Sequence, residues 1–331
     1  MIITRTPFRL SFFGGGTDYP AWYQKNGGAV LSTTIDKYCY ISCRYLPPFF
    51  EHKYRIVYSL IENVNTFADI QHPSVKAVLT WLECNKGLEV HHDGDLPARS
   101  GLGSSSSFTV GLINAINALR GNYTTHEQLA QDALYVEQEV IKEEVGSQDQ
   151  IAAAYGGLNK IEFFEDSTFK VNPVILQRER LDELQDHLVL FFTGVSRYST
   201  DIAKTKIANF QNRQSQLHAM REMVDESLSI LGSSTTSILD FGKLLHESWL
   251  HKKSLSNKVS TDFIDDIYST AIKSGALGGK ILGAGGGGFI AFFAPPEKHT
   301  TLISKLNELI HVPFRFENMG SQVVMYQPNG F

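Results

Sequence analysis

The sequence predicts a two-domain α+β protein, in which an N-terminal domain of mixed strands and helices precedes a helix-rich domain that ends in strands. Its 331 residues suit two domains of ordinary size. Segments with the two-residue period of strands are mixed with amphipathic helices up to about residue 165, and a long helical stretch, about 199–274, then follows almost without Pro or Gly. We expect the boundary near 160–185 and divide the chain into 1–170 and 171–331.

The composition indicates an ordinary globular protein. Hydrophobic residues make up 42% of the chain, and 30 Lys and Arg against 35 Asp and Glu give a net charge of −5. This excludes a disordered or collagen-like chain and argues against a nucleic-acid partner, although a local basic pocket for a small anion stays open. No signal peptide or apolar run of membrane-spanning length is apparent, and the three cysteines form no CxxC pair. We therefore expect a soluble cytoplasmic protein with no membrane partner.

The first half should begin with a strand over residues 2–13, because Phe8, Leu10 and Phe12 alternate with Arg9, Ser11 and Phe13. Further β-rich segments and helical spacings follow, and we expect strands at 28–44, 53–60 and 88–93 and helices at 74–86, 104–120 and about 125–144.

The second half should open with a strand at 187–193 before the long helical stretch. The chain then returns to β-like segments. We expect strands at 288–294, 312–317 and 321–327, with one helix near 296–310.

Three glycine-rich segments stand out, namely FGGGTD at 13–18, RSGLGSSSS at 99–107 and KILGAGGGG at 280–288. The third segment formally matches GxGxxG, but it runs into the strand-like segment FIAFF rather than opening a helix, which counts against a dinucleotide site. The sequence contains no GxxxxGK[ST], GxSxG or HExxH, which excludes a P-loop and weakens hydrolase and zincin hypotheses.

The middle loop is the better candidate for an anion site. Residues 101–107 (GLGSSSS) open directly into the predicted helix at 104–120, whose first backbone N–H groups and positive dipole end favour a phosphate. The serine hydroxyls could cap the helix or ligate a Mg²⁺ ion carried by phosphates. From the residues alone, a simple helix cap in a flexible turn is an equally good explanation.

Two acidic residues downstream favour phosphate chemistry. Glu137 falls within the apolar stripe of the helix at 125–144, where a carboxylate is costly unless it is paired or bound to a cation, so a metal role competes with a salt bridge to an arginine. Asp149 could stabilise the first turn of a short helix or accept a proton from a substrate hydroxyl. Arg9 could assist that acid, neutralise phosphate or be solvated. Together these residue types suit phosphoryl transfer without a P-loop.

With its three motifs in order, the chain resembles the GHMP small-molecule kinases, which include galactokinase, homoserine kinase and mevalonate kinase, over essentially its whole length. PFR through TDY at 7–19 resembles the family's first motif, 101–107 its second and 283–288 its third. The resemblance implies an N-terminal domain like ribosomal protein S5 and a ferredoxin-like, helix-rich C-terminal domain. It also implies ATP and Mg²⁺ as cofactors.

Within the family, FRLSFFGGGTDYP and VGSQDQIAAAYGG are similar to the kinases that phosphorylate the anomeric oxygen of D-glycero-D-manno-heptose 7-phosphate for nucleotide-activated heptose and surface polysaccharides. Galactokinases have Gly-Glu-His where this chain has Gly14, Gly15 and Gly16, so the side chains that grip galactose are missing. The resemblance thus implies a sugar phosphate as the small-molecule partner. It does not indicate the oligomeric state.

The resemblance also assigns roles. It implies Asp149 as the catalytic base with Arg9 beside it, and Ser105 and Glu137 as the Mg²⁺ ligands. Nucleotide binding falls to Gly101, Leu102, Gly103, Ser104, Ser105 and Ser106. Substrate binding falls to Asp18, Gly15, Gly16, Thr17, Gly285 and Gly286. A distal phosphate would need cations, for which we expect Arg197, with Lys204 and Arg99 as further candidates, unless these residues are simply solvated.

Two alternatives remain open at this stage. One is a kinase of the same family that acts on an unphosphorylated hexose such as fucose or galactose. The other is a non-catalytic module that senses a sugar and a nucleotide, against which the intact serine and acid pair argue.

Overall fold

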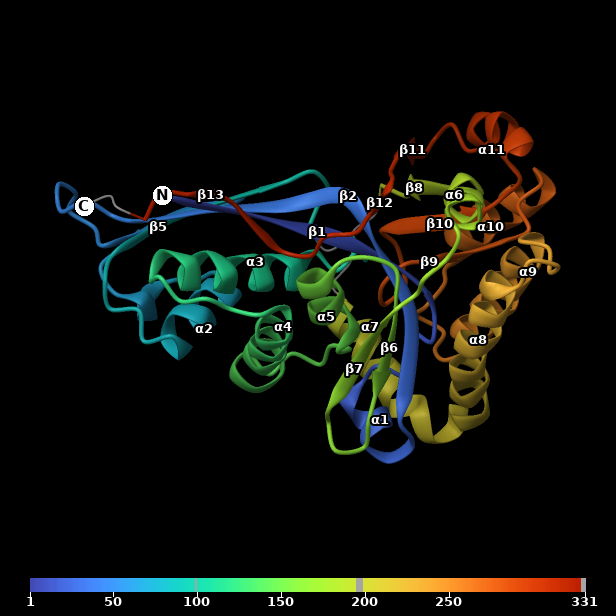
Figure 1. Cartoon of the computed structure of the whole chain (residues 1–331), viewed down its shortest axis with the longest axis horizontal. Coiled ribbons are helices and arrows are strands. Elements are labelled where there is room, and N and C mark those ends of the chain that lie inside the picture. Colours follow the sequence, from blue (N-terminus) through green and yellow to red (C-terminus); the bar gives the residue numbers. More distant parts are fainter. Residues whose placement is uncertain (99, 195–198, 329–331) are drawn as a thin grey trace.

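The computed structural model describes residues 1–98, 100–194 and 199–328, and its elements follow the chain in a mixed α and β order. Two long strands, β1 (Ile2–Phe13) and β2 (Gly28–Tyr45), pair antiparallel over almost their full length and form the backbone of the first sheet (Figure 1). The other strands of this sheet are β3 (Tyr54–Val57), β4 (Ile61–Val64), β5 (Leu88–Gly94), β6 (Asn159–Phe163), β7 (Phe169–Pro173), β12 (Phe316–Glu317) and β13 (Gln322–Tyr326).

The order β13-β1-β2-β5-β3-β4 runs across the sheet, and β6 and β12 pair with other parts of β2. Helices of the first half cover one face, where α3 packs directly on β1 and β2 (Figure 1). These helices are α1 (Pro20–Asn26), α2 (Pro73–Trp81), α3 (Ser104–Leu119), α4 (His126–Tyr135) and α5 (Gln148–Tyr155).

A second, antiparallel sheet has the order β11-β8-β10-β9. Its strands are β8 (Leu188–Phe192), β9 (Gly278–Ile281), β10 (Phe289–Phe293) and β11 (Ile310–His311). The second half of the chain supplies the helices α6 (Arg178–Asp186), α7 (Ser199–Asn209), α8 (Gln214–Gly232), α9 (Leu239–Ser254), α10 (Asp262–Lys273) and α11 (His299–Lys305).

The chain does not stay in the second unit to its end. β13 pairs with β1, and Phe316 and Glu317 of β12 pair with β2, so the last strands complete the first sheet. Figure 1 accordingly shows β13 beside the labelled N-terminus. A division of the chain at residues 170/171 therefore does not correspond to two separate spatial units, because β1 pairs with the last strand of the chain.

The expected helix at 125–144 is regular only to Tyr135 and continues as a π-helical turn over Val136–Val140. Lys142 then adopts a positive φ of 61°, and the chain leaves the helix. Other elements are shorter than expected. The helix expected at 74–86 ends at Trp81, the strand expected at 312–317 is reduced to Phe316–Glu317, and the helix expected near 296–310 is regular only over His299–Lys305.

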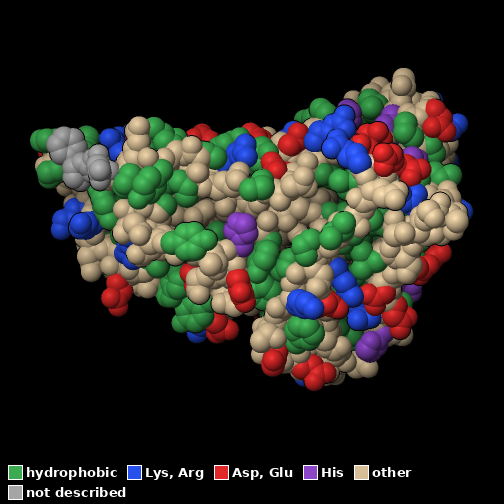
Figure 2. All heavy atoms as spheres, viewed as in Figure 1, with side chains coloured by type: hydrophobic (Ala, Val, Ile, Leu, Met, Phe, Trp, Pro, Cys, Tyr) green, Lys and Arg blue, Asp and Glu red, His purple; other side chains and the backbone are tan. Residues whose placement is uncertain are grey.

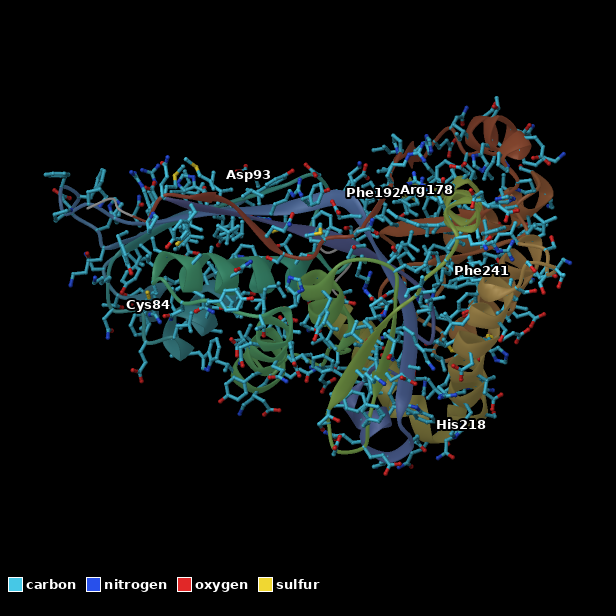
Figure 3. The ribbon with its side chains drawn as sticks, viewed as in Figure 1. Cys84, Asp93, Arg178, Phe192, His218 and Phe241 are labelled. Carbon is cyan, nitrogen blue, oxygen red and sulfur yellow. The ribbon has the colours of Figure 1, made fainter. Side chains whose placement is uncertain are left out.

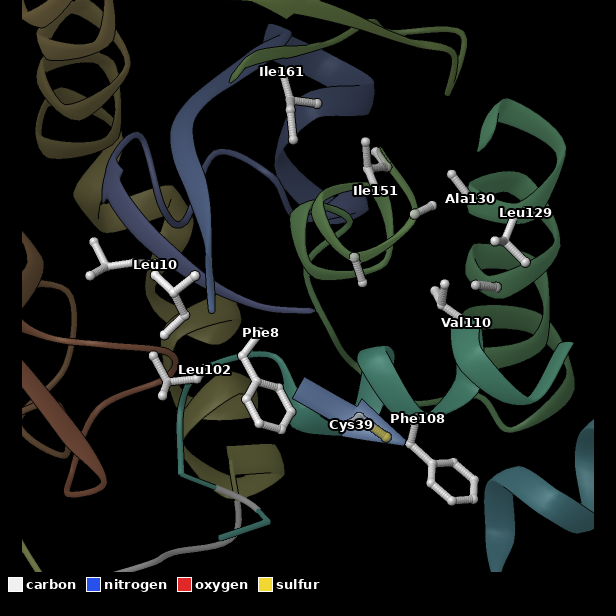
Figure 4. Close-up of a cluster of buried hydrophobic side chains, with 14 of the residues drawn as sticks. Phe8, Leu10, Cys39, Leu102, Phe108, Val110, Leu129, Ala130, Ile151 and Ile161 are labelled. Carbon is white, nitrogen blue, oxygen red and sulfur yellow. The ribbon is translucent and has the colours of Figure 1, made fainter. Parts of the chain in front are cut away.

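Core residues anchor each segment that bears a candidate site residue. Phe8 and Leu10 flank Arg9, Leu102 lies between Gly101 and Gly103, and Ile151 follows two residues after Asp149. All four apolar side chains belong to one buried cluster, part of which Figure 4 shows. Because these anchors are nearly fully buried, they fix the backbone from which the polar side chains project.

The three cysteines, Cys39, Cys43 and Cys84, are buried and unpaired, as a packing role requires, and Figure 3 places Cys84 beside α2. In the same figure Phe241 lies at the other end of the molecule, where its ring contacts Phe12 and Phe13 edge-on at 5.4 and 5.0 Å between centroids. These contacts join α9 to β1 and hold the second half of the chain against the first.

Over the described ranges, none of the helices is both long and apolar enough to cross a bilayer. On the face shown in Figure 2, acidic and basic side chains are interspersed, so the basic groups form no continuous field there.

Candidate active site

One cavity of about 230 Å³ brings the candidate residues together. Its wall from the first half of the chain consists of β1, the glycine loop that follows it, the start of α3, the π-helical turn and the start of α5. Its wall from the second half comes from α7, α9, β9 and the third glycine loop. Segments that are as far apart in the sequence as Arg9 and Ala284 therefore meet at one place.

Arg9 and Asp149 form a two-point ion pair inside this cavity. Arg9 Nε donates to Asp149 Oδ1 at 2.7 Å and Nη2 donates to Oδ2 at 2.8 Å, while Nη1 donates to the carbonyl of Gly101 at 2.6 Å. The Arg9 side chain is 4% exposed and that of Asp149 is 26% exposed. The solvated alternative for Arg9 is therefore wrong, and the guanidinium holds the carboxylate in a fixed orientation that still faces the cavity.

The second and third glycine loops pack backbone to backbone. A Cβ on Gly101 would lie 2.5 Å from the carbonyl oxygen of Leu282, and one on Gly283 would lie 2.6 Å from Cα of Gly101. Both residues also have positive φ, at 88° and 67°. Only glycine satisfies both requirements, so this glycine pair is what allows the second half of the chain to approach the start of α3.

The N-terminus of α3 is open toward the cavity. Gly103 occupies the N-cap position with φ 75° and supplies no side-chain cap, and Ser104, Ser105 and Ser106 line the cavity. The N-terminal end of a 16-residue helix, with its positive dipole end, thus faces the cavity. The capping alternative for the serines does not hold at this N-terminus, because no serine caps the helix.

Glu137 is the buried carboxylate of the cavity. Its Oε2 accepts a hydrogen bond from Ser106 Oγ at 2.9 Å and a second from Gln150 Nε2, whereas its Oε1 has no partner among the described residues. Burial raises the pKa of Glu137 to about 7 and the nearby Glu143 adds to this rise, while the hydroxyl of Thr109 and the hydrogen bonds from Gln150 and Ser106 oppose it. No arginine is paired with it within the described residues, so the salt-bridge alternative does not hold there.

This arrangement fits a hard cation. The described residues contain no group of three His, Cys, Asp or Glu side chains that could hold a metal by themselves. Mg²⁺ does not need such a group, because it typically binds one or two carboxylates together with substrate phosphates. A buried carboxylate oxygen without a partner, next to serine hydroxyls at a helix N-terminus, is a suitable donor set.

Asp18 lies deeper, at the end of the first glycine loop. Gly16 N donates to its Oδ1 and Gln148 Nε2 to its Oδ2, both at 2.8 Å. Burial raises the pKa of Asp18, as does the nearby Asp149. A Cβ on Gly146 would lie 2.0 Å from Oδ2, which explains why the segment GSQDQ begins with glycine. The first loop and the start of α5 are therefore interlocked around this carboxylate.

Three buried lysines from the second half of the chain complete the cavity. Lys206 on α7, Lys252 on α9 and Lys280 on β9 all line it, and each is at most 5% exposed. Lys280 Nζ donates to the carbonyl of Phe12 at 2.7 Å, and Lys252 Nζ donates to the carbonyls of Ile281 and Gly283 at 2.6 and 2.7 Å. Burial lowers the pKa of Lys206 to about 8 and that of Lys280 to about 7.

Other predicted site residues lie beside the cavity rather than in its lining. The Thr17 hydroxyl donates to the carbonyls of Gly14 and Ala29, and the Leu102 side chain is in the core. Gly285 and Gly286 contact the backbone of Val259. Of the predicted residues, those that line the cavity are Arg9, Gly15, Gly16, Asp18, Gly101, Gly103, Ser104, Ser105, Ser106, Glu137 and Asp149.

Of the three cations expected for a distal phosphate, Lys204 is not among the residues that line this cavity. Lys204 is exposed, and Arg197 and Arg99 lie outside the described residues. Sequence reasoning missed Lys206, although a signal for it existed. Ala203 and Ile207 on α7, and Phe210 directly after its end, lie at positions −3, +1 and +4 from this lysine and pack on the cluster around Tyr19 and Trp22. The periodicity that singles out Glu137 thus singles out Lys206 too.

Comparison with known proteins matches both halves of the chain. Residues 70–157 match the family described as "GHMP kinases N terminal domain", and residues 232–311 match "GHMP kinases C terminal". A curated D-glycero-alpha-D-manno-heptose 7-phosphate kinase from Campylobacter jejuni is 33% identical, and the similarity covers 93% of each chain.

Solved structures share the fold. A D-glycero-D-manno-heptose 1-phosphate kinase from Bacteroides thetaiotaomicron has a TM-score of 0.79 at 24% identity and covers 97% of this chain and 98% of its own. A Lactococcus lactis galactokinase in complex with galactose has a TM-score of 0.75 at 19% identity, with 98% and 95% covered.

Proposed function

The chain belongs to the GHMP kinase family, and we propose that it is an ATP- and Mg²⁺-dependent sugar 1-kinase whose substrate is D-glycero-D-manno-heptose 7-phosphate. The family membership makes it a phosphotransferase with an alcohol group as acceptor. The finer assignment places the phosphoryl group on the anomeric hydroxyl and gives the 1,7-bisphosphate. We also propose a cytoplasmic role in supplying nucleotide-activated heptose for surface polysaccharides. The name of the Campylobacter jejuni relative supports the choice of sugar.

One observation carries this proposal, namely that Asp149, Glu137 and the open N-terminus of α3 line the same cavity. Phosphoryl transfer needs an acceptor hydroxyl, a neutralised phosphate chain and alignment between them. Asp149 is held by Arg9 at 2.7 and 2.8 Å with its carboxylate partly exposed to the cavity, which suits it to accept or orient the anomeric proton.

The donor side lies at the start of α3. The backbone N–H groups of the Gly101–Ser106 segment would bind phosphate oxygens, and Ser105 together with the free Oε1 of Glu137 would hold Mg²⁺. When bound, Mg²⁺ neutralises charge on the phosphates. Ser106 orients the Glu137 carboxylate through its hydrogen bond of 2.9 Å, and Gln150 does so from the other side.

The acceptor side is formed by Gly15, Gly16 and Asp18. A Cβ added to Gly15 would make only ordinary van der Waals contacts. A Cβ added to Gly16 would lie 3.2 Å from a methyl group of Leu217, and the φ of Gly16 is 116°, so a side chain is disfavoured there. Gly15 and Gly16, which line the cavity in place of larger side chains, leave room for a seven-carbon sugar, and Asp18 is the hydrogen-bond acceptor for its hydroxyls. An unphosphorylated hexose remains the alternative substrate for this chain, since a galactokinase in complex with galactose has the same fold.

The test is an ADP-release assay with ATP and Mg²⁺ and two sets of acceptors. We expect turnover of D-glycero-D-manno-heptose 7-phosphate and a new phosphate at C1, observed by ³¹P NMR. Free galactose, fucose and mannose should be turned over at least about 10²-fold less efficiently. Efficient turnover of a free hexose, with none of the heptose 7-phosphate, would replace the proposed substrate.

A further inference from the structure

The unusual feature of the cavity is its cationic wall, which consists of Lys206, Lys252 and Lys280. The pKa of Lys252 lies well below its usual range because of burial, with Lys280 and Lys206 adding to the effect. Three neighbouring buried ammonium groups are costly in a folded protein unless an anion compensates them. Each lysine comes from a different element of the second half of the chain, so no single motif predicts them.

The three lysines differ in how many N–H donors they still offer. An ammonium group has three donors. Lys252 uses two on backbone carbonyls and Lys280 uses one. Lys206 makes no hydrogen bond or ion pair within the part of the chain that the structure describes, and its Nζ lies 5.2 Å from the centre of the Tyr19 ring. Lys206 is therefore the buried cation that is available to a ligand.

The packing of α7 holds Lys206 in this place. Phe210, four residues further on and directly after the end of α7, contacts the rings of Tyr19 and Trp22 at 5.9 and 6.1 Å between centroids, and Ala203, one turn before Lys206, is 3% exposed. His218 of α8, which is labelled in Figure 3, also packs on the Trp22 ring, at 5.1 Å between centroids. A side chain between two such anchors cannot turn to solvent without moving the helix.

We propose that Lys206, with Lys280 beside it, binds the phosphate monoester that the acceptor sugar carries at the end remote from the transferred phosphoryl group. This inference rests on the proposed function for the identity of the sugar. A phosphate dianion supplies the charge and the acceptor oxygens that the free donors of these lysines lack.

Two observations favour the sugar's phosphate over the phosphates of the nucleotide. The carboxylates that act on Lys206 are Asp18 and Asp149, both on the acceptor side, whereas Glu137 on the donor side is not among them. The neighbouring groove of about 690 Å³ shares Tyr19, Glu143, Glu144 and Val145 with the cavity, but Glu127 and Glu139 add two further carboxylates to it, and no lysine or arginine is among the described residues that line it. A phosphate would be repelled from that groove, so the lysine wall is where it is favoured.

The decisive experiment compares Lys206→Met with Lys204→Met, since Lys204 is two residues away on the same helix but exposed. With heptose 7-phosphate, Lys206→Met should raise KM about 30-fold or more and leave KM for ATP within about twofold. The same heptose without its 7-phosphate should show no such penalty. Lys206→Arg should restore part of the affinity, and Lys204→Met should match the wild type.

Two results would overturn the inference. One is an equal loss with the phosphorylated and the unphosphorylated heptose. The other is a loss that appears in KM for ATP, which would assign Lys206 to the donor phosphates.

A binding measurement without ATP keeps this test separate from the proposed function. If heptose 7-phosphate is not turned over, the proposed substrate fails. Thermal shifts with a panel of sugar phosphates, their dephosphorylated forms and inorganic phosphate then still test the anion site. We expect at least one sugar phosphate to stabilise the wild type and Lys204→Met but not Lys206→Met. Equal stabilisation of all three proteins, or of none, contradicts the site.

Discussion

The two walls of the cavity carry side chains of opposite charge. The wall from the first half of the chain carries Asp18, Glu137 and Asp149, and each of these carboxylates is held by hydrogen bonds from neighbouring residues. The wall from the second half carries Lys206, Lys252 and Lys280, two of which are held by backbone carbonyls. In the proposed function, the acidic wall would bind a hydroxyl and a cation, and the lysine wall would bind an anion.

The difference indicates a division of labour in catalysis. On the acidic wall, Glu137 and Asp149 should act mainly on turnover, because the proposed mechanism places them at the reacting atoms, whereas Asp18 should act on the affinity for the sugar. Groups on the lysine wall should act mainly on the affinity for the sugar, because the proposed distal phosphate does not react. The four predictions below test this division, beginning with the largest effect.

Asp149→Asn should lower kcat about 10²- to 10⁴-fold, because the amide cannot accept the proton of the anomeric hydroxyl. ATP binding, measured by calorimetry, should remain nearly unchanged. The control is Asp266→Asn, since Asp266 is an exposed residue of α10. Unchanged turnover in Asp149→Asn, or a loss confined to the KM of the sugar, would remove the distinction between the two walls.

Glu137→Gln should raise the Mg²⁺ concentration needed for half-maximal activity about tenfold or more, because the free Oε1 loses its charge while the hydrogen-bonded frame of Ser106 and Gln150 stays in place. The measurement is a metal titration at saturating ATP and sugar. Glu139→Gln is the matched control, two residues further on the π-helical turn and exposed. Identical titrations for both variants would exclude Glu137 from the metal site.

Much of the fold could be predicted from the sequence. The two-residue period of Phe8, Leu10 and Phe12 predicted β1, and the glycine–serine loop predicted where α3 begins. The return of β12 and β13 to the first sheet could not be predicted, because the partner of an edge strand is set by tertiary packing rather than by local pattern. The early end of α4 was also missed, because residues 136–140 keep a helical spacing while their backbone is π-helical.

The acidic wall of the site could be predicted in part, because its residues lie in motifs. Glu137 stood out as a charge in an apolar stripe, and Asp149 as the acid before a short apolar helix. The lysine wall could not be predicted from motifs, because Lys252 and Lys280 owe their burial to contacts with the backbone of distant segments. Lys206 could have been found from the apolar stripe of α7, whereas we expected a phosphate contact from Lys204, which is exposed.

Gly146→Ala should raise the KM of the sugar about tenfold with a smaller effect on kcat, because the new methyl group would lie 2.0 Å from Asp18 Oδ2 and must displace it. The measurement is steady-state kinetics together with the melting temperature. Gly232→Ala is the control, since no atom lies within 4 Å of its virtual Cβ. If Gly146→Ala binds the sugar normally, Asp18 is not an acceptor-side ligand, and the acidic wall contributes to turnover alone.

The smallest effect is a difference in how stability depends on pH, and it distinguishes the walls without any substrate. The pKa of Glu137 is about 7 in the folded protein, above the value of about 4.3 for an unfolded glutamate. Between these values the unfolded state releases its proton first, so the free energy of unfolding falls as the pH rises from about 4 to 7. Lys280, with a pKa of about 7 against about 10.4 when unfolded, has the opposite effect, since stability falls as the pH drops from about 10 to 7.

Each effect should disappear when its charge is removed. In metal-free buffer, the melting temperature of Glu137→Gln relative to the wild type should increase by a few degrees between pH 4.5 and 7. That of Lys280→Met should increase by a similar amount as the pH falls from 9.5 to 7. The exposed controls Glu139→Gln and Lys258→Met should follow the wild type at every pH. If the melting temperatures of both cavity variants follow the wild type at every pH, burial of the two charges has no free-energy cost. The proposed need for a bound cation on one wall and a bound anion on the other would then lose its physical basis.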